Sequence, residues 1–284
     1  MIIAIDVGGT KISAALIHQG NIIEQRKIDS VVHTDLQSLA KRLWQLCSDW
    51  QDKANALAVA CTGQVGSSHV NFLSVKQKLP LKEQLTNLFN LPTTIINDAA
   101  AAAWAEYKLN NTKDDTLVYI TVSTGIGGGI IQNGQLVTSL DGFCAHLGHM
   151  SVSTKHNDIR CHCGRLNCVE AISSGTAIAK KASTILNSPV NCKDVFGKYT
   201  GNSQITELIE QSTDAVIELI ANIKAITGTS TLVLGGSVGS APLFRNQILQ
   251  KIKKLPEIYQ LEVLPPKSGS NADLMGVYYF VAGE

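Results

Sequence analysis

The chain has 284 residues, 44% of them hydrophobic and 17% charged, which is an ordinary globular composition with room for two modest domains. Its formal net charge of +1 gives no electrostatic reason to expect binding to nucleic acid or to a membrane surface. No apolar run approaches the ~18 residues that span a bilayer, and without a signal or transit segment the expected location is the cytoplasm. The seven cysteines argue against a disulfide framework and favour free thiols or a metal site.

The first 115 residues alternate strand and helix patterns. Residues 1–31 predict a small antiparallel sheet of three strands, and the spacing of leucines over 35–50 predicts an amphipathic helix. Further strands are expected over 56–61 and 93–96, and further helices over 81–89 and 99–109. This order predicts a mixed sheet covered by helices.

A second unit restarts near residue 116. A strand over 117–122 leads into a Gly-rich turn at 124–129 and another strand. Sliding the chain by 114 positions sets Thr10 on Thr124 and Gly20 on Gly134, with matching turns and apolar alternation. We therefore predict a duplicated unit, whose two lobes each present a Gly-rich turn to a nucleotide in a cleft.

The repeat also sets the expected domains. The N-terminal lobe is predicted over 1–115, with a C-terminal helix at about 270–284 packing back on it, and the C-terminal lobe over 116–269. Inside the second lobe the patterns predict helices and strands over 175–186, 205–227, 231–234, 241–253 and 261–264.

The first strand runs directly into a polar turn made of Asp6, Gly8, Gly9, Thr10 and Lys11. Glycines let backbone N–H groups approach an anion, the threonine hydroxyl can donate to a phosphate oxygen, and the carboxylate can hold Mg²⁺. The alternative is a tight hairpin turn that carries a polar cluster. The GxxxxGK[ST] spacing of a P-loop is absent, so the lysine is expected to be a surface residue.

A metal site is expected from His149, Cys161, Cys163 and Cys168. Three thiols within eight residues and an upstream imidazole match a tetrahedral Cys₃His zinc set, and four protein ligands make the metal structural. The alternative is a group of reduced, buried cysteines. Three other histidines could replace the fourth ligand: His146, His156 and His162. The remaining thiols are expected to be small hydrophobic residues: Cys47, Cys61, Cys144 and Cys192.

Asp98 lies between an apolar strand and an alanine-rich helix. It is a candidate N-cap of that helix. A carboxylate at the end of a strand can also serve as a general base that accepts a hydroxyl proton during phosphoryl transfer. The two roles are compatible, because one oxygen can cap while the other faces a substrate.

These motifs together resemble those of the ROK family of sugar kinases and sugar-responsive repressors. The matching segments span nearly the whole chain: IDVGGTK (5–11), INDAAAAAWAE (96–106), STGIGGG (123–129), LGHM (147–150), CxCGRxNCVEAISSG (161–175) and VLGGS (233–237). The resemblance implies an α/β, two-lobed actin-like ATPase fold (a duplicated ribonuclease H-like fold) with ATP in the cleft, and a homodimer.

The resemblance also assigns roles to single residues. Asp98 matches the catalytic base, and Asp6, Gly8, Gly9, Thr10 and Lys11 match the first phosphate motif. The second phosphate motif and the nucleoside positions correspond to Ser123, Thr124, Gly125, Gly127, Gly128, Gly129, Gly235 and Gly236. The sugar-binding positions correspond to Gly63, Asn97, Asp98, His146, His149 and Glu170, with His149 also a zinc ligand.

Departures from the family pattern bear on the substrate. His146 stands where the family usually carries glutamate, and this histidine is common in its bacterial members that act on N-acetylmannosamine. Asn167 replaces a glycine, which alters a turn, and the segment 71–82 lacks the usual Asn-Leu-Gly-Gly-type loop. The expected reaction is therefore transfer of a phosphoryl group from ATP, with Mg²⁺, to the 6-hydroxyl of N-acetyl-D-mannosamine in sialic acid degradation.

Three alternatives remain at this point. One is a kinase for glucose, N-acetylglucosamine or another hexose, which the altered 71–82 segment leaves open. The second is a sugar-sensing repressor, which would carry a helix-turn-helix ahead of the first strand. The third is a sugar-binding protein without catalysis, which the intact Asp98 and both Gly-rich turns disfavour.

Overall fold

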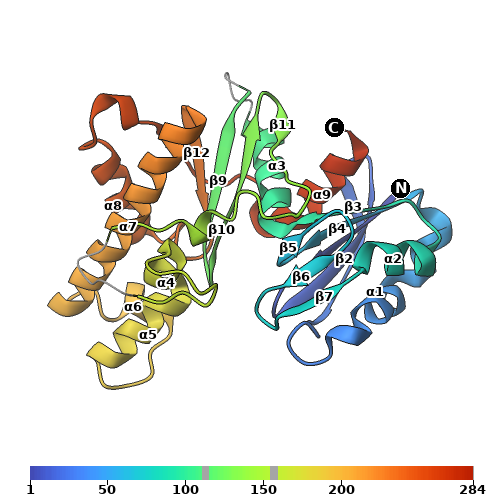
Figure 1. Ribbon diagram of the computed structural model, residues 1–284, viewed down its shortest axis with the longest axis horizontal. Coiled ribbons are helices and arrows are strands. Elements are labelled where there is room, and N and C mark those ends of the chain that lie inside the picture. Colours follow the sequence, from blue (N-terminus) through green and yellow to red (C-terminus); the bar gives the residue numbers. More distant parts are fainter. Residues whose placement is uncertain (111–114, 154–158, 284) are drawn as a thin grey trace. The chain divides into compact units, whose positions relative to one another are not determined.

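The computed structural model (Figure 1) describes residues 1–110, 115–153 and 159–283. The chain forms two compact units, which are described separately. The first comprises Met1–Asn111, Leu136–Ala145 and Lys267–Glu284, and the second comprises Thr112–Gln135 and His146–Pro266. The segment Leu136–Ala145 thus belongs to the first unit, whereas the division at residue 115 assigned it to the second.

The first unit is built on a five-stranded sheet in the order β3-β2-β1-β4-β8. Its strands are β1 (Ile2–Val7), β2 (Lys11–His18), β3 (Asn21–Asp29), β4 (Ala56–Cys61) and β8 (Thr93–Asn97). The first three are antiparallel neighbours, and β4 pairs in parallel with both β1 and β8. The helices of this unit are α1 (Leu39–Cys47), α2 (Leu81–Phe89), α3 (Asp98–Asn110) and α9 (Ala272–Ala282) (Figure 1).

Alternation along β1 explains how helices cover both faces of this sheet. Ile3 and Ile5 point into a core shared with α1 and α2, whereas Ala4 points into a core shared with α9. The small residue allows close packing on the second face. There α9 approaches α3 so closely that a Cβ on Gly276 would lie 1.8 Å from the Ala101 carbonyl oxygen, which brings the first turns of the two helices together.

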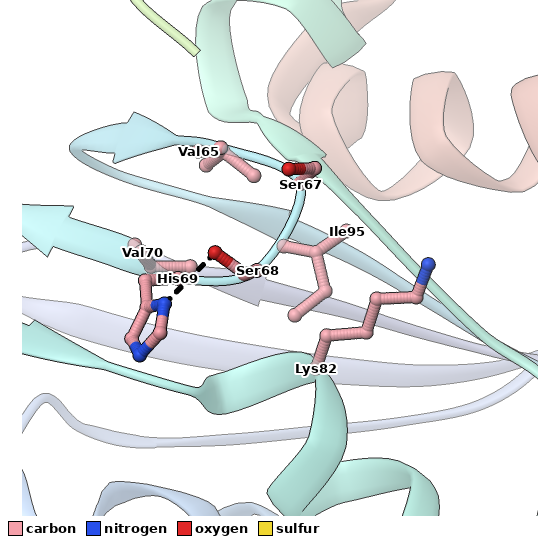
Figure 2. A pocket seen from close by; sticks show the side chains of 8 residues that line it. Val65, Ser67, Ser68, His69, Val70, Lys82 and Ile95 are labelled. Atoms are coloured by element: carbon pink, nitrogen blue, oxygen red, sulfur yellow. Dashed lines mark hydrogen bonds between the residues drawn. The ribbon is translucent and has the colours of Figure 1, made fainter. Parts of the chain in front are cut away.

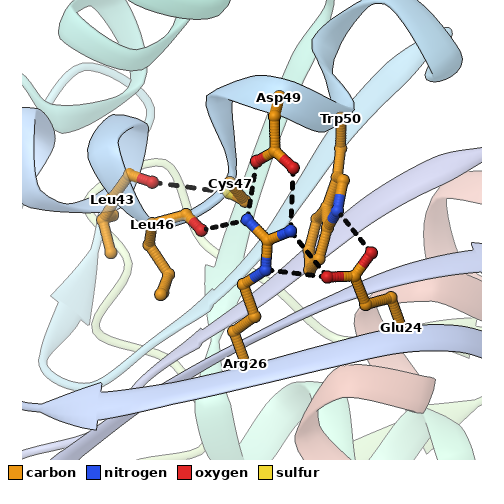
Figure 3. Close-up of polar contacts among 7 residues, drawn as sticks. All are labelled: Glu24, Arg26, Leu43, Leu46, Cys47, Asp49 and Trp50. Atoms are coloured by element: carbon orange, nitrogen blue, oxygen red, sulfur yellow. Dashed lines mark hydrogen bonds and ion pairs between the residues drawn. The ribbon is translucent and has the colours of Figure 1, made fainter.

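A polar cluster fastens α1 and the turn after it to the edge strand β3 (Figure 3). The Arg26 guanidinium donates to both carboxylate oxygens of Asp49, at 2.6 and 2.8 Å, and to Glu24. It also stacks on the Trp50 ring at 4.4 Å, and the indole N–H donates to Glu24 at 3.0 Å. The planar fork of arginine suits this combination of bidentate pairing and stacking.

A small antiparallel sheet of β5 (Gln64–Val65), β6 (Val70–Phe72) and β7 (Gln77–Leu79) follows β4. It contains most of the segment 71–82, in which no strand was expected. Phe72 and Leu79 are buried, so two apolar side chains anchor the hairpin to the core.

The second unit repeats the topology of the first. Its sheet has the order β11-β10-β9-β12-β13, again with an antiparallel central pair, β10 with β9, and with β12 parallel to both β9 and β13. The strands are β9 (Leu117–Val122), β10 (Ile126–Gln132), β11 (Gln135–Leu136), β12 (Thr231–Gly235) and β13 (Glu262–Leu264). The helices are α4 (Val169–Ser173), α5 (Gly175–Ile185), α6 (Cys192–Gly197), α7 (Ser203–Thr227) and α8 (Pro242–Ile252) (Figure 1).

Most expected elements lie where the patterns placed them. The helix expected over 35–50 is shorter than predicted, because 3₁₀ turns at Leu36–Ser38 and Ser48–Lys53 flank α1. The turn expected over 124–129 is also too long, since β10 already begins at Ile126. Among the helices of the described residues, none combines the length and apolarity that crossing a membrane requires.

Candidate active site and metal centre

The turn between β1 and β2 presents backbone N–H groups next to a carboxylate. The Gly8 N–H donates to the Lys11 carbonyl at 3.0 Å, and a Cβ on Gly8 would lie 3.0 Å from the same oxygen. Thr10 is exposed, so its hydroxyl is accessible to a ligand. The Lys11 ammonium forms an ion pair with Asp29 on β3, as expected for a surface lysine.

Three carboxylates of the first unit interact beside this turn. Asp6 lies near the end of β1, Asp98 begins α3, and Asp273 lies in the first turn of α9. Burial and the charge of Asp98 raise the pKa of Asp6 to about 7, against the opposing effect of Lys27. Burial, Asp6 and Asp98 likewise raise the pKa of Asp273 well above its usual value. These hard oxygen donors are the type that Mg²⁺ prefers.

The start of α3 is capped by Asn97. Its Oδ1 accepts the Ala100 N–H at 3.2 Å, three residues along, which is the N-cap pattern. Asp98 accepts the N–H of the next residue, Ala99, at 2.9 Å. The prediction that Asp98 caps the helix is therefore wrong, because the neighbouring amide holds that position.

Gly63 follows β4 and is tied to the same helix start. Its carbonyl accepts the Asn97 side-chain N–H at 3.0 Å, its φ is +100°, and a Cβ there would lie 2.7 Å from the Asn71 carbonyl. Glycine is thus required at this turn, and two expected sugar-binding residues, Gly63 and Asn97, are in contact.

Two hollows open in the first unit and share the loop 66–69. The smaller, of about 70 Å³, is shown in Figure 2, where Ser67, Ser68 and Lys82 surround it. The larger, of about 460 Å³, is lined by Gln64, Gly66, Ser67, Ser68, His69, Asn71, Lys78, Pro80, Leu140 and Asp141. Its volume is in the range of small-molecule pockets, and the segment 71–82 contributes part of its wall.

In the second unit the corresponding turn is Ser123–Gly125. The Ser123 carbonyl accepts the N–H of Gly175 at 2.7 Å, and the Thr124 carbonyl accepts the Thr176 hydroxyl at 2.9 Å. The Ile126 N–H that ends the turn donates to the Glu170 carboxylate at 2.8 Å. The turn is thus held in place by α4 and the start of α5.

The three glycines that follow lie in β10, where they serve packing. Gly127, Gly128 and Gly129 pair with β9, and the last two are buried. A Cβ on Gly128 would lie 2.3 Å from the Leu147 side chain. Of the second Gly-rich motif, Ser123, Thr124 and Gly125 thus form the turn, and Gly127, Gly128 and Gly129 lie in the strand that follows it.

Gly235 and Gly236 end β12 and turn the chain toward α8. A Cβ on Gly235 would meet the Tyr119 hydroxyl at 2.7 Å, and Gly236 has a φ of +83°. The N–H groups of Val238 and Gly239 donate to the Val122 carbonyl at 2.9 and 3.0 Å. This loop therefore lies against the end of β9, next to Ser123.

The predicted metal ligands come together in the second unit. The donor atoms of His149, Cys161, Cys163 and Cys168 all lie within 4.8 Å of one another. The Cys163 and Cys168 sulfurs are 3.6 Å apart, and the Cys161 sulfur is 3.7 Å from His149 Nδ1. Tetrahedral zinc with Zn–S bonds of about 2.3 Å separates neighbouring donors by roughly 3.6–3.8 Å, so this donor set fits the metal.

The turn around these ligands explains the departure at position 167. Asn167 has a φ of +58°, a conformation that asparagine tolerates better than most residues. Its side chain accepts the Ile159 N–H at 3.0 Å. Asparagine therefore keeps the turn that glycine would form. Of the alternative histidine ligands, His156 lies outside the described residues.

The expected sugar-binding residues of the second unit surround His149. The rings of His146 and His149 stack at 6.2 Å, and the His162 ring meets His149 edge-on at 5.3 Å. Glu170 Oε1 lies 3.4 Å from His162 Nδ1. Zinc ligation and the expected sugar contacts thus share one imidazole.

Cysteines outside the metal set show no sign of reactivity. Cys47 is buried and its pKa is raised to about 12 by burial, and burial raises the pKa of Cys192 to about 11. Burial, together with Asp98 and Asp6, also raises the pKa of Cys61. Thiols held in this protonated form are poor nucleophiles.

Two contacts of these sites were not predicted from the sequence: that of Asp273 with the other carboxylates, and that of His162, named above only as an alternative zinc ligand, with Glu170. Asp273 is an ordinary acidic residue in the first turn of a helix by its local sequence, and the packing of α9 on α3 and on the sheet places it beside Asp6 and Asp98. His162 stands between two cysteine ligands, but its approach to Glu170 depends on the fold of the loop. No local pattern signals either contact.

The chain is similar to known proteins both in sequence and in structure. Residues 2–284 match the profile described as the ROK family. The N-acetylmannosamine kinase of Escherichia coli O127:H6 is 37% identical to this chain, and the alignment covers 99% of this chain and 98% of the relative. The N-acetylmannosamine kinase of Haemophilus influenzae strain PittEE is 35% identical, and the alignment covers 98% of this chain and 94% of the relative. A ROK family glucokinase from Streptomyces griseus, crystallised with glucose and AMPPNP, superposes with a TM-score of 0.82 at 23% identity, covering 100% of this chain and 99% of that chain. The fold is thereby that of the actin-like ATPases, as the sequence resemblance implied.

Proposed function

Because the chain belongs to the ROK family, we propose that it is an ATP-dependent sugar kinase that phosphorylates N-acetyl-D-mannosamine at the 6-hydroxyl. The observation that carries the proposal is Asp98. It is held at the start of α3 beside Asn97 and Gly63, two residues expected to bind the sugar. The relatives of 33–37% identity named N-acetylmannosamine kinase support the choice of substrate. We place the reaction in sialic acid degradation.

In the proposed reaction Asp98 acts as general base. Its carboxylate accepts the proton of the C6 hydroxyl while that oxygen attacks the γ-phosphorus of ATP. The bond from the γ-phosphorus to the β,γ-bridging oxygen breaks, and ADP leaves with the electron pair. The products are N-acetylmannosamine 6-phosphate, ADP and a proton held on Asp98.

The remaining sugar and nucleotide roles follow the same proposal. His146, His149 and Glu170 would hold sugar hydroxyl or acyl oxygens, together with Gly63 and Asn97. The N–H groups of Gly9 and Thr10 in the first turn, and of Thr124 and Gly125 in the second, suit phosphate oxygens. Asp6 supplies a hard ligand for Mg²⁺, which would supply positive charge against the transferring phosphoryl group. Gly235 and Gly236 are candidates for the nucleoside end.

We propose that zinc in the Cys₃His set is structural, because four protein donors leave no open position for water. Thiolate ligands and an ATP substrate suit the reducing cytoplasm, and we propose that location. The family resemblance further leads us to propose a homodimer, which light scattering of the purified protein tests by mass.

The experiment that tests the function measures ADP formation with ATP-Mg²⁺ and a panel of sugars. N-acetylmannosamine should give the highest kcat/KM, with glucose and N-acetylglucosamine at least about tenfold lower, the scale that one or two altered polar contacts produce. Equal turnover of glucose would instead favour a general hexokinase, the alternative that the altered segment 71–82 leaves open. Absence of turnover with every sugar would refute the proposal.

A further inference from the structure

His162, Glu170 and His149 form a second group of metal-binding side chains beside the thiolate set. One donor atom from each residue lies within 4.8 Å of the other two. Two imidazoles and one carboxylate are a ligand set that binds Zn²⁺ and leaves a fourth position open. Nothing in the proposed kinase reaction uses His162.

The local contacts orient these donors as metal ligands require. Glu170 Oε2 accepts the Ile126 N–H at 2.8 Å, which leaves Oε1 facing His162 Nδ1 at 3.4 Å. Such a hydrogen bond to the second oxygen fixes a ligating carboxylate. His162 is 57% exposed, so an ion from solvent can reach the group, while His149 is buried.

The two groups share His149, which has two ring nitrogens. Nδ1 lies 3.7 Å from the Cys161 sulfur and so faces the thiolate set. We therefore assign the other ring nitrogen, Nε2, to the second group. An ion bound there displaces the proton of that nitrogen to solvent, so its binding costs more than ordinary imidazole ligation. The second site is therefore the weaker of the two.

We propose that His149, His162 and Glu170 form a second divalent-cation site, filled by Zn²⁺ at excess metal, whose occupancy blocks sugar binding. The blocking rests on the proposed function, because His149 and Glu170 are proposed sugar-binding residues. The metal site itself rests only on the three donors. Zinc then acts on this enzyme in two ways: one ion supports the fold and a second inhibits.

Metal counting tests the site without any activity assay. Purified full-length protein is equilibrated with excess Zn²⁺ by dialysis and the bound metal is measured. We expect two ions per chain in the wild type, one in His162→Ala, and two in the control His18→Ala, which removes an exposed histidine at the end of β2. Glu170→Gln, which keeps an acceptor for Ile126, should weaken the second ion at least tenfold.

Cobalt identifies the donors. Co²⁺ added to protein that already holds one zinc should give d–d absorption without a thiolate-to-cobalt charge-transfer band. A charge-transfer band, a single ion in the wild type, or a second ion retained in His162→Ala would overturn the proposal. In the last two cases His162 only donates a hydrogen bond to Glu170.

The kinetic arm separates this proposal from the function. Zn²⁺ should raise the apparent KM for sugar at least fivefold in the wild type and not in His162→Ala. If no sugar is phosphorylated, the proposed function fails while the metal counts still decide the second site. If turnover is normal and zinc inhibits both proteins equally, the blocking role is wrong.

Discussion

The two five-stranded sheets share one strand order but carry different chemistry at the turn after their first strand. In the first unit the turn Gly8–Gly9 lies beside interacting carboxylates, including Asp6, whose pKa is raised to about 7. In the second unit the turn Ser123–Gly125 is followed by the Ile126 N–H, which donates to Glu170 next to the metal ligands.

The two units therefore use the same strand order for different chemistry. Charge gathered at the first turn can accept a proton or hold Mg²⁺, and this costs stability, since the carboxylates repel one another. The second turn carries no such charge on its own residues. It is braced by hydrogen bonds from α5 and to Glu170, whose neighbour His149 belongs to the metal centre.

The largest effect is expected from the carboxylate that begins α3. Asp98→Asn should lower kcat about 10³-fold, within the usual range for losing a general base, while Tm changes little because Asn97 caps the helix. Steady-state kinetics and thermal unfolding measure the two quantities. Asp52→Asn, on the exposed surface of the same unit, is the control and should retain full activity. Near-normal turnover by Asp98→Asn would contradict the role of Asp98 as the general base.

The second unit should depend on its metal. Cys163→Ser removes one of four zinc donors, and we expect Tm to fall by about 10 °C, corresponding to several kcal/mol, with loss of the bound ion. Metal analysis and calorimetry report both. Cys192→Ser in the same unit lies outside the cluster and should keep one zinc per chain. Equal metal content and Tm in the two variants would contradict a structural zinc.

The pH dependence of stability should arise in the first unit. Asp6 and Asp273 hold their protons more tightly in the folded protein than in the unfolded chain, because their pKa values are raised. The contribution of these protonated carboxyl groups to the free energy of unfolding is therefore complete below pH about 4. It is lost as the pH rises through about 7, where Asp6 ionises in the folded state.

Asp273→Asn should therefore reduce the loss of unfolding free energy between pH 5 and pH 8 by about 2 kcal/mol. Urea unfolding without Mg²⁺ measures it, with Asp52→Asn as the matched control. A variant that loses as much stability as the wild type over this interval would show that folding does not raise the pKa of Asp273.

The smallest effect concerns the edge of the first sheet. Arg26→Ala removes the fork to Asp49 and the stack on Trp50, and we expect a loss of about 1–2 kcal/mol in unfolding free energy without a change in KM. Arg26→Lys keeps the charge but should recover less than half of that loss. Full recovery by lysine would mean that charge alone, and not the planar fork, holds α1.

Much of the fold could be predicted from sequence because both units contain long periodic segments. The strand at Ala56–Cys61 and the helix at Leu81–Phe89 agree with the expected bounds. The small sheet over Gln64–Leu79 was missed, since strands of two or three residues carry no measurable alternation.

The candidate sites were less predictable. The four candidate zinc donors are recognisable by spacing, because metal geometry constrains the sequence locally. Gly127–Gly129 were taken for a turn, although pairing with β9 and packing under Leu147 require small residues in a strand there. Asp273 joins Asp6 and Asp98 only through the contact of α9 with α3, which depends on residues far apart in the chain.

The most direct test of the account is to identify the product by NMR after incubating the protein with ATP, Mg²⁺ and N-acetylmannosamine. We predict one ADP per phosphorylated sugar, with the ³¹P signal coupled to the protons on C6. ADP without phosphorylated sugar, or phosphate attached at another carbon, would contradict the assignment of Asp98 as the base for the 6-hydroxyl.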